Sequence, residues 1–174
     1  MRLHTALSLD GGAPGSGRLT GMFFDDLIPD TTASSAERTI TEADVMSFAR
    51  LTGDFVKLHT DEEFAKRTSY GRRIAHGALV FSVSIGLATE MHLFDDALIA
   101  FVGVDKLRFV APVFLGDTVH VVKTVVERKP LDASKGTVTF ASRVLNERGE
   151  LVLTYRDRLL IERHPAPTET ADPS

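Results

Sequence analysis

The stretch that decides the fold runs from Gly53 to Leu87 and reads GDFVKLHTDEEFAKRTSYGRRIAHGALVFSVSIGL. It passes from a polar loop into a segment, Gly77 to about Glu90, in which apolar residues occupy nearly every position of a helix and the polar exceptions are small serine and threonine side chains. A helix that is apolar all round is typically buried. The sequence therefore predicts a central helix that the rest of the chain covers.

The segments that precede this helix have recognisable boundaries. Residues 37–41 predict a short strand, and Thr41 followed by Asp44 is typical of a helix start. Helical spacing of apolar residues then continues up to a loop from Asp54 to Thr60. Acidic residues at the start and basic residues at the end of Asp61 to Thr68 favour a short second helix, because this arrangement complements the helix dipole.

The C-terminal half consists of long segments rich in Val, Thr, Phe and Ile, separated by short turns. Short connections between long strands imply antiparallel hairpins. At about 3.3 Å per residue, such strands are longer than the central helix, so a twisted sheet can curl round it. The predicted fold class is α+β, with one long antiparallel sheet wrapped around one central buried helix. The predicted strands are Leu98 to Val110, Asp117 to Arg128, Lys135 to Asn146 and Leu151 to Arg163.

The composition excludes several classes of function. The 174 residues carry a net charge of -4 with acidic and basic residues interspersed, so no basic face is available to follow a nucleic acid backbone. The absence of cysteine excludes a thiolate nucleophile and a cysteine zinc site. The apolar stretches are much shorter than the roughly 20 residues of a membrane span, and the start of the chain lacks a signal-peptide pattern. No membrane association is predicted, and the cytoplasm is the expected compartment.

Gly, Pro, Ser and Thr are enriched at both ends of the chain. Residues 1–21 and 164–174 have too little apolar surface to offset the entropy of ordering them, so both segments are expected to be flexible. Between them the sequence contains neither a second linker nor an internal repeat. Residues 22–163 are therefore predicted to form a single domain.

The polar loop carries a candidate catalytic pair, Asp54 and His59, five positions apart. A carboxylate and an imidazole can take a proton from water and return one to carbon, and because both are expected to hold the same water, their proton roles stay shared. A solvated Asp is a weak base, so burial has to raise its pKa. The expected apolar walls are Phe55, Val56 and Leu58.

The start of the central helix supplies a candidate for stabilising negative charge on oxygen. If the helix begins at Gly77, the N–H of this residue has no intrahelical acceptor, lies at the positive end of the helix dipole and, without a Cβ beside it, allows a carbonyl to approach. The Gly77 N–H is therefore the predicted oxyanion donor. His76 is expected to brace the helix start and is left out of the catalytic pair.

Each candidate residue also has a purely structural interpretation. An Asp that follows Gly53 is typical of an Asx turn, and an isolated histidine is typical of a core side chain bonded to backbone. The presence of Asp54, His59 and the His-Gly helix start along one chain favours catalysis over these interpretations. A metal site is not predicted, because its candidate ligands lack a recognisable ligand spacing. Those candidates are His59, Asp61, Glu62 and His76.

In order and spacing, these motifs resemble those of the MaoC-like dehydratase and R-specific enoyl-CoA hydratase family, whose fold is called the hot dog. The resemblance covers roughly Phe23 to Glu162. The matching pieces are Asp54 with His59, Asp61, Ile74-Ala75-His76-Gly77, and the segment 108–117, RFVAPVFLGD.

The resemblance implies a hydro-lyase that adds water reversibly to 2-enoyl thioesters and gives (R)-3-hydroxyacyl thioesters. The thioester of coenzyme A or of acyl carrier protein would be the substrate, and adding water needs no further cofactor. The resemblance also implies the oxyanion role of Gly77 and places residues near Phe109 against the acyl-pantetheine arm. A homodimer is expected, because one sheet on one helix leaves exposed edges; the resemblance implies the same, and trimers of such dimers occur in hot-dog proteins.

One position departs from the family pattern. Where the family usually has Asn-Pro in the catalytic loop, this chain has Val56-Lys57, which removes a side-chain amide and a rigid residue. The preferred interpretation is an altered loop shape or substrate preference. Two alternatives stay open: an acyl-CoA thioesterase on the same fold, and a catalytically silent subunit that binds acyl thioesters.

Overall fold

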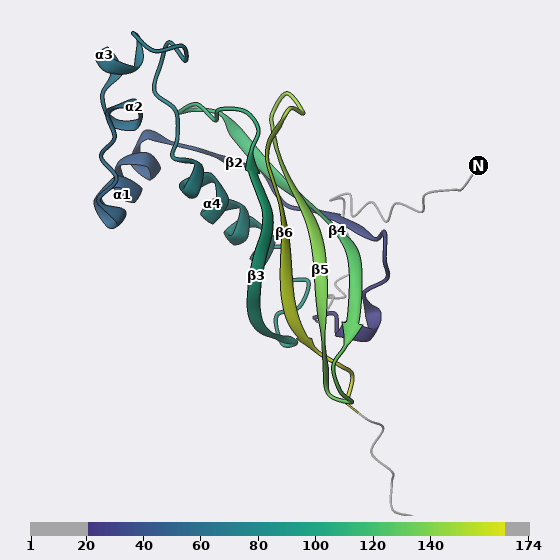
Figure 1. Cartoon of the computed structure of the whole chain (residues 1–174). Helices are drawn as coiled ribbons and strands as arrows, with labels where there is room; N and C mark the ends of the chain where they lie inside the picture. Colours follow the sequence, from purple (N-terminus) through teal and green to yellow (C-terminus); the bar gives the residue numbers. More distant parts are fainter. Residues whose placement is uncertain (1–20, 166–174) are drawn as a thin grey trace, which may run out of the picture.

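The computed structural model describes residues 21–165, and most of the two ends predicted to be flexible, residues 1–20 and 166–174, lie outside the described residues. The described part combines one antiparallel sheet with a few helices, which confirms the α+β class (Figure 1). Within it, no helix has the length and apolarity that crossing a membrane requires. The helical segments are η1 (Phe24–Asp26), α1 (Glu42–Thr52), α2 (Lys57–Thr60), α3 (Glu62–Ala65) and α4 (Gly77–Thr89).

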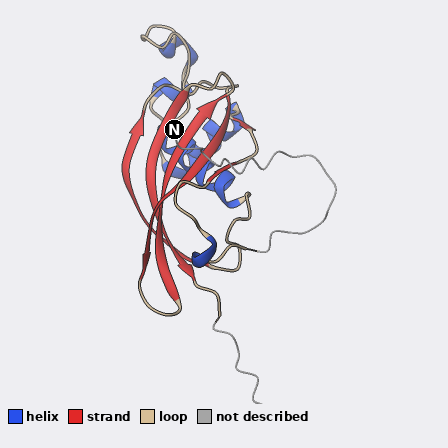
Figure 2. Cartoon of the chain, turned by 90° about the vertical axis from the view of Figure 1, so that its right-hand side faces the viewer, coloured by secondary structure: helices blue, strands red, loops and turns tan. Residues whose placement is uncertain are grey.

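The sheet has six strands, whose order is β1-β4-β5-β6-β3 with β2 also paired to β4. All pairings are antiparallel. The four long strands agree with the predicted ones to within two residues at each end, and Figure 2 shows them curving together as one sheet. The strands are β1 (Thr32–Ser34), β2 (Arg38–Thr39), β3 (Leu98–Phe109), β4 (Thr118–Pro130), β5 (Lys135–Asn146) and β6 (Leu151–Glu162).

The two short strands differ from the prediction. The strand predicted for residues 37–41 is reduced to β2, and β1 was not predicted. Both pair with β4, and β1 is tied to it further by a hydrogen bond between the Thr32 and Thr124 hydroxyls at 3.0 Å. Segments this short are held by the strand beside them rather than by a pattern of their own, so the sequence carries little signal for them.

The central helix α4 lies against the inner face of the sheet, and its sheet-facing side is buried as predicted. One side of the helix is uncovered in the single chain, as expected for one sheet wrapped on one helix, because Ala78, Ser82 and Gly86 are exposed. These residues recur at a spacing of four and form one stripe along the helix, because a single sheet can cover only one side of it. The buried residues of α4 are Leu79, Val80, Val83, Ser84 and Leu87.

The helix α1 begins and ends as predicted. Thr41 Oγ1 accepts from the Asp44 N–H at 3.1 Å, and Asp44 Oδ2 accepts from the Thr41 N–H at 2.8 Å, which completes the capping box. The helix ends at Gly53, whose left-handed conformation, with a φ of 79°, is accessible to glycine at little cost. This turn directs the chain into the loop that carries the predicted catalytic pair.

The segments after α1 are more helical in one place and less helical in another than predicted. The predicted loop contains α2, a single turn closed by the Asp61 N–H, which donates to the Lys57 carbonyl at 2.9 Å. The second predicted helix, Asp61 to Thr68, is shortened to α3. Its end is set by Thr68, whose hydroxyl and N–H both donate to the Ala65 carbonyl and replace the next helical bond.

Candidate active site

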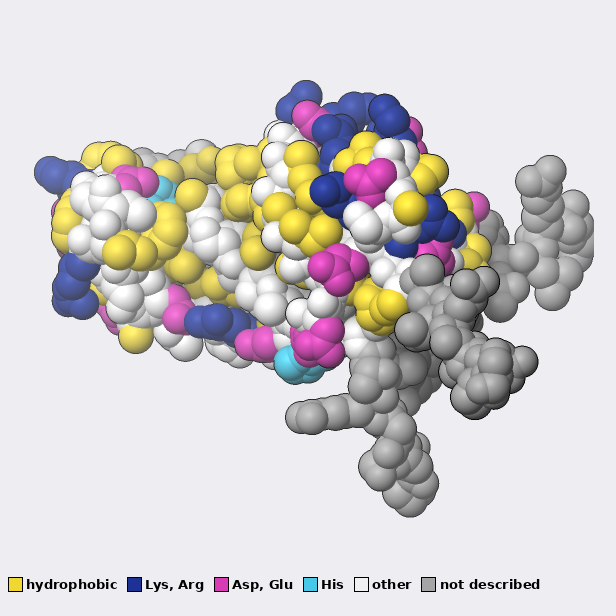
Figure 3. Space-filling view, turned by 90° about the horizontal axis from the view of Figure 1, so that it is seen from below, with side chains coloured by type: hydrophobic (Ala, Val, Ile, Leu, Met, Phe, Trp, Pro, Cys, Tyr) yellow, Lys and Arg dark blue, Asp and Glu magenta, His cyan; other side chains and the backbone are white. Residues whose placement is uncertain are grey.

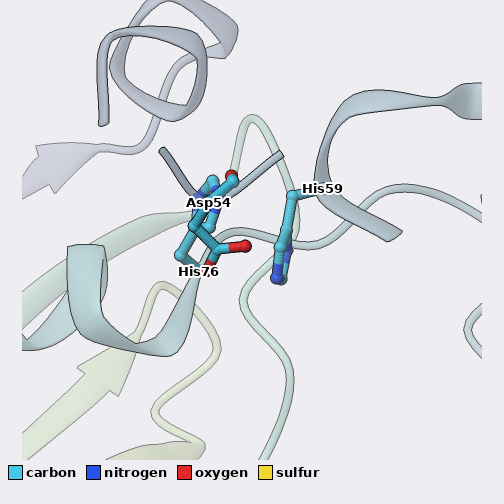
Figure 4. Close-up of side chains that lie close together, drawn as sticks. All are labelled: Asp54, His59 and His76. Carbon is cyan, nitrogen blue, oxygen red and sulfur yellow. The ribbon is translucent and has the colours of Figure 1, made fainter. Parts of the chain in front are cut away.

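Three segments meet at the start of α4: the loop after α1, the short helix α2 and the residue that precedes α4. They bring together the side chains of Asp54, His59 and His76, which offer carboxylate and imidazole atoms within 4.8 Å of one another (Figure 4). The structure therefore places the predicted catalytic pair side by side and adds His76 as a third member of the cluster.

His59 lies beside the cavity at the start of α4 with one ring nitrogen available. Its Nδ1–H donates to the Ile74 carbonyl at 2.8 Å, and because a carbonyl only accepts, this bond assigns the lone pair to Nε2. Burial lowers the pKa of His59 below its ordinary value of 6.5, and the hydrogen bond to Ile74 opposes this shift in part. The imidazole is therefore neutral at neutral pH and can accept a proton from water at Nε2.

Asp54 is half-buried, and its carboxylate also shapes the loop. Oδ1 accepts from the Val56 N–H at 3.3 Å in an Asx-type turn, which confirms the structural interpretation of this residue, while its catalytic role stays a prediction. The expected apolar walls are largely wrong: Phe55 is 52% exposed and Val56 is 56% exposed. Both residues precede the single turn α2, and the Asp54 carboxylate instead lies within 4.8 Å of ring nitrogens of His59 and His76.

His76 braces the helix start, as predicted. It is 2% exposed, and its Nε2–H donates to the Asp54 carbonyl at 3.0 Å. Its ring also packs on that of His59, with ring centroids 4.0 Å apart. His76 thus ties the Asp54 loop to α4 and limits the orientation of the His59 ring. Its Nδ1 is buried and has no hydrogen-bond partner among residues 21–165.

A cavity of about 400 Å³ adjoins this cluster, and the two predicted substrate contacts, Gly77 and Phe109, both line it together with His59. Gly77 is the first residue of α4, so its N–H has no acceptor within the helix. The Phe109 ring lies directly against it, since a Cβ at position 77 would be 2.7 Å from the nearest ring atom. Only glycine leaves room for this ring beside the start of the helix.

The arrangement can hold a water between the Asp54 carboxylate and Nε2 of His59, and a carbonyl oxygen at the Gly77 N–H. These are the parts that general acid–base chemistry beside a polarised carbonyl requires. The alternative metal site with Asp61 and Glu62 is not formed by the described residues. Asp61 caps α3 by accepting from the Phe64 N–H at 3.0 Å, and Glu62 pairs with Arg73 at 3.2 Å. A metal-free site stays a prediction.

A buried ion pair beneath α4 was not predicted from the sequence. Lys123 and Asp157 are 3% and 0% exposed; the ammonium donates to Asp157 Oδ2, and the Ser142 hydroxyl donates to Oδ1 at 2.7 Å. Burial lowers the pKa of Lys123, although Asp157 opposes the shift. The signal was present in the strand period, because both residues take inward positions in rows of apolar side chains on β4 and β6.

Residues 25–146, well over half of the chain, match the family model described as the MaoC like domain. The chain belongs to the MaoC-like domain family. The matched region contains all four site residues predicted from the sequence, Asp54, His59, Gly77 and Phe109. The departure at Val56-Lys57 is thus a variation inside a MaoC-like domain.

Named relatives of this MaoC-like chain include hydratases and dehydratases. An (R)-specific enoyl-CoA hydratase of Rhodospirillum rubrum is 35% identical over 129 residues, which cover 72% of this chain and 86% of the relative. A 3-hydroxybutyryl-CoA dehydratase of Methylorubrum extorquens is 36% identical over 110 residues, covering 63% of this chain and 67% of the relative. Protein MaoC of Klebsiella aerogenes is 35% identical over 99 residues; these cover 57% of this chain but only 29% of that longer protein.

Solved structures agree on the fold. A monoamine oxidase regulatory protein from Archaeoglobus matches with a TM-score of 0.79 and 41% identity, covering 83% of this chain and 97% of that chain. A Mycobacterium tuberculosis protein with a double hotdog fold matches with a TM-score of 0.74 and 24% identity, covering 90% of this chain and 48% of that chain. The predicted hot-dog fold of this MaoC-like domain is confirmed.

Proposed function

We propose that this MaoC-like protein is a hydro-lyase that adds water reversibly to 2-enoyl thioesters and forms (R)-3-hydroxyacyl thioesters. The observation that carries the proposal is that His59 and Gly77 line one cavity, while Asp54 offers a carboxylate oxygen within 4.8 Å of the His59 imidazole. The relatives named as an (R)-specific enoyl-CoA hydratase and a 3-hydroxybutyryl-CoA dehydratase support this class of reaction. The R stereochemistry rests on this likeness.

The reaction begins with a water held by the Asp54 carboxylate and Nε2 of His59. The pair takes one proton from the water while its oxygen bonds to C3 of the enoyl group and the C2–C3 π electrons move toward the thioester carbonyl. The developing enolate oxygen accepts from the Gly77 N–H. C2 then receives a proton from the same pair, so the protonation of the pair is unchanged over one cycle and no further cofactor is needed.

The substrate is the thioester of coenzyme A or of acyl carrier protein. Phe109, at the end of β3, is 58% exposed and lies against Gly77 at the cavity. An exposed aromatic ring in this place can pack against the pantetheine arm while the carbonyl oxygen lies at the helix start. Phe109 is thus proposed as a contact to substrate and has no proton to transfer.

We also propose a homodimer formed through β3. This strand lies at the end of the sheet order, and the space-filling view shows apolar side chains exposed in patches on one face of the molecule (Figure 3). An unpaired edge that carries exposed apolar residues is suited to pairing with a second copy. Light scattering after gel filtration should give a dimer mass, and Val102→Lys should lower it. The large exposed apolar residues of β3 and the position after it are Leu98, Ile99, Phe101, Val102, Phe109 and Val110.

The proposed reaction is tested with crotonyl-CoA, by following loss of the conjugated double bond and release of free thiol in parallel. Asp54→Asn should lower kcat/KM for hydration by about 10²-fold or more, because the substitution removes a base and keeps the shape. The matched control is Glu63→Gln, an equally conservative change at an exposed residue of α3. Unaltered hydration in Asp54→Asn would exclude this mechanism.

The same experiment decides between the alternatives. Thiol release without prior loss of the double bond identifies a thioesterase. Binding of crotonyl-CoA with neither change identifies a silent acyl-thioester-binding subunit, in line with the altered Val56-Lys57 positions. Hydration without thiol release supports the hydro-lyase.

A further inference from the structure

A second cavity, of about 320 Å³, lies along the C-terminal half of α4. Most of its walls are apolar side chains of α4, β3 and the segment between them. The exceptions include Lys123 and Asp157, the buried ion pair that the proposed reaction does not use. The apolar lining residues include Phe81, Ile85, Ala88, Leu98, Phe101 and Leu159.

The Lys123 ammonium has more N–H donors than the described residues supply acceptors for. An ammonium group has three N–H donors. Among residues 21–165, its hydrogen-bond acceptor is Asp157 Oδ2, and the Phe140 ring centroid lies 4.8 Å from Nζ. Donors left without an acceptor in a buried place are unfavourable, so an oxygen atom that entered the cavity would be stabilised there.

The charges around this cavity favour an uncharged oxygen. Lys123 and Asp157 cancel each other, so this buried pair leaves the cavity without net charge. A ligand carboxylate would leave excess negative charge against apolar walls, which burial disfavours. A hydroxyl or carbonyl oxygen can accept from the Lys123 ammonium without adding charge.

The two cavities share α4 as a wall. Ala78 lines the first cavity, Ile85 and Thr89 line the second, and all three lie on the side of the helix that carries the exposed stripe. Ile85 lies eight positions after Gly77, which corresponds to about 12 Å along the helix axis. An extended acyl chain whose carbonyl lies at Gly77 can therefore follow α4 and place its far end in the second cavity.

We propose that the second cavity receives the far end of the acyl chain and that Lys123 donates a hydrogen bond there to an uncharged hydroxyl or carbonyl oxygen of that chain. The protein thus selects oxygenated acyl chains over plain alkyl chains of the same length. This inference rests on the proposed function, because it takes an acyl thioester as the ligand of the first cavity.

Calorimetric binding of saturated acyl-CoA thioesters tests the inference without requiring turnover. The series runs from hexanoyl-CoA to dodecanoyl-CoA, with each length measured as the alkyl, the ω-hydroxy and the ω-carboxy compound. At the lengths that reach Lys123, the ω-hydroxy compound should bind about 10-fold more tightly than the alkyl compound, as expected for a hydrogen bond to a charged group. Equal affinity at every length, or tightest binding of the ω-carboxy compound, would overturn the inference.

A double variant identifies the donor. Lys123→Met with Asp157→Val removes both charges together, so that neither is left buried alone, and the ratio of ω-hydroxy to alkyl affinity should fall to about 1. Lys66→Met with Glu63→Gln, a change to an exposed ion pair, is the matched control and should keep the ratio. A preference that persists in the Lys123 variant refutes the assignment, and if this variant does not fold, the wild-type series still decides. Hydration of crotonyl-CoA is measured separately, so that failure of the proposed function is distinguished from absence of the preference.

Discussion

Replacing Gly77 with alanine is expected to abolish most activity while the protein stays folded. The added Cβ would lie 2.7, 2.9 and 3.0 Å from three atoms of the Phe109 ring, so the ring has to move. The methyl group and the displaced ring then occupy the space from which a thioester oxygen reaches the Gly77 N–H. Loss of one oxyanion donor typically lowers kcat by about 10²- to 10³-fold.

The free energy of unfolding should change little, because Phe109 is 58% exposed and its ring can rotate into solvent. Alanine is also favoured over glycine in helices by up to about 1 kcal/mol, which offsets the cost of moving the ring. For a chain of this size, a net change below 1 kcal/mol corresponds to a shift in Tm of less than about 4 °C.

Gly136→Ala is the matched control, because a Cβ at Gly136 would also overlap a phenylalanine ring, that of Phe24. Phe24 is 2% exposed and has no solvent to rotate into. Overpacking of this kind costs about 1–3 kcal/mol, so this variant should have a lower Tm and keep its activity below the transition.

The two variants are compared by kcat/KM for crotonyl-CoA and by Tm from circular dichroism. Wild-type activity in Gly77→Ala would refute the argument that a Cβ at this position blocks access of the thioester oxygen to the Gly77 N–H. A fall in Tm as large as that of Gly136→Ala would instead refute the argument that the exposed Phe109 ring can move into solvent with little loss of stability. A Gly77→Ala, Phe109→Ala double variant separates the effect of the methyl group from that of the displaced ring.

Three further outcomes are expected. Val56→Asn with Lys57→Pro should raise the free energy of unfolding by about 1 kcal/mol in urea denaturation, because Val56 is the N-cap of α2 and Lys57 its first residue, where proline fits; a decrease would contradict this. Lys123→Met alone should lower the free energy of unfolding by about 3–5 kcal/mol, because it leaves Asp157 buried without its counter-ion, and adding Asp157→Val should recover most of the loss. Since folding lowers the pKa of His59, the unfolded chain binds more protons below pH 6.5, so the part of stability linked to His59 is present above that pH and lost as the pH falls. Tm measured against pH should therefore fall less steeply on the acid side in His59→Gln, and an unchanged slope would contradict the linkage.

Interactions between residues close together in the sequence were sufficient to predict most of the helices and strands. The capping box of Thr41 and Asp44, the glycine that ends α1 and the short turns between the long strands all act over a few residues, and their boundaries were predicted closely. The spacing of Asp54 and His59 likewise placed both on one short segment before α4, where the structure brings them together.

What the tertiary structure alone decided concerns residues that are distant in sequence. Which side of α4 stays exposed, the bond from His76 to the Asp54 carbonyl and the pairing of Lys123 with Asp157 depend on how the sheet curls against the helix. Strand periodicity places a charged residue on an inner face but does not name its partner, which here lies 34 residues further along the chain. Such contacts arise only when packing closes the whole sheet on α4, because no local preference of either residue encodes them.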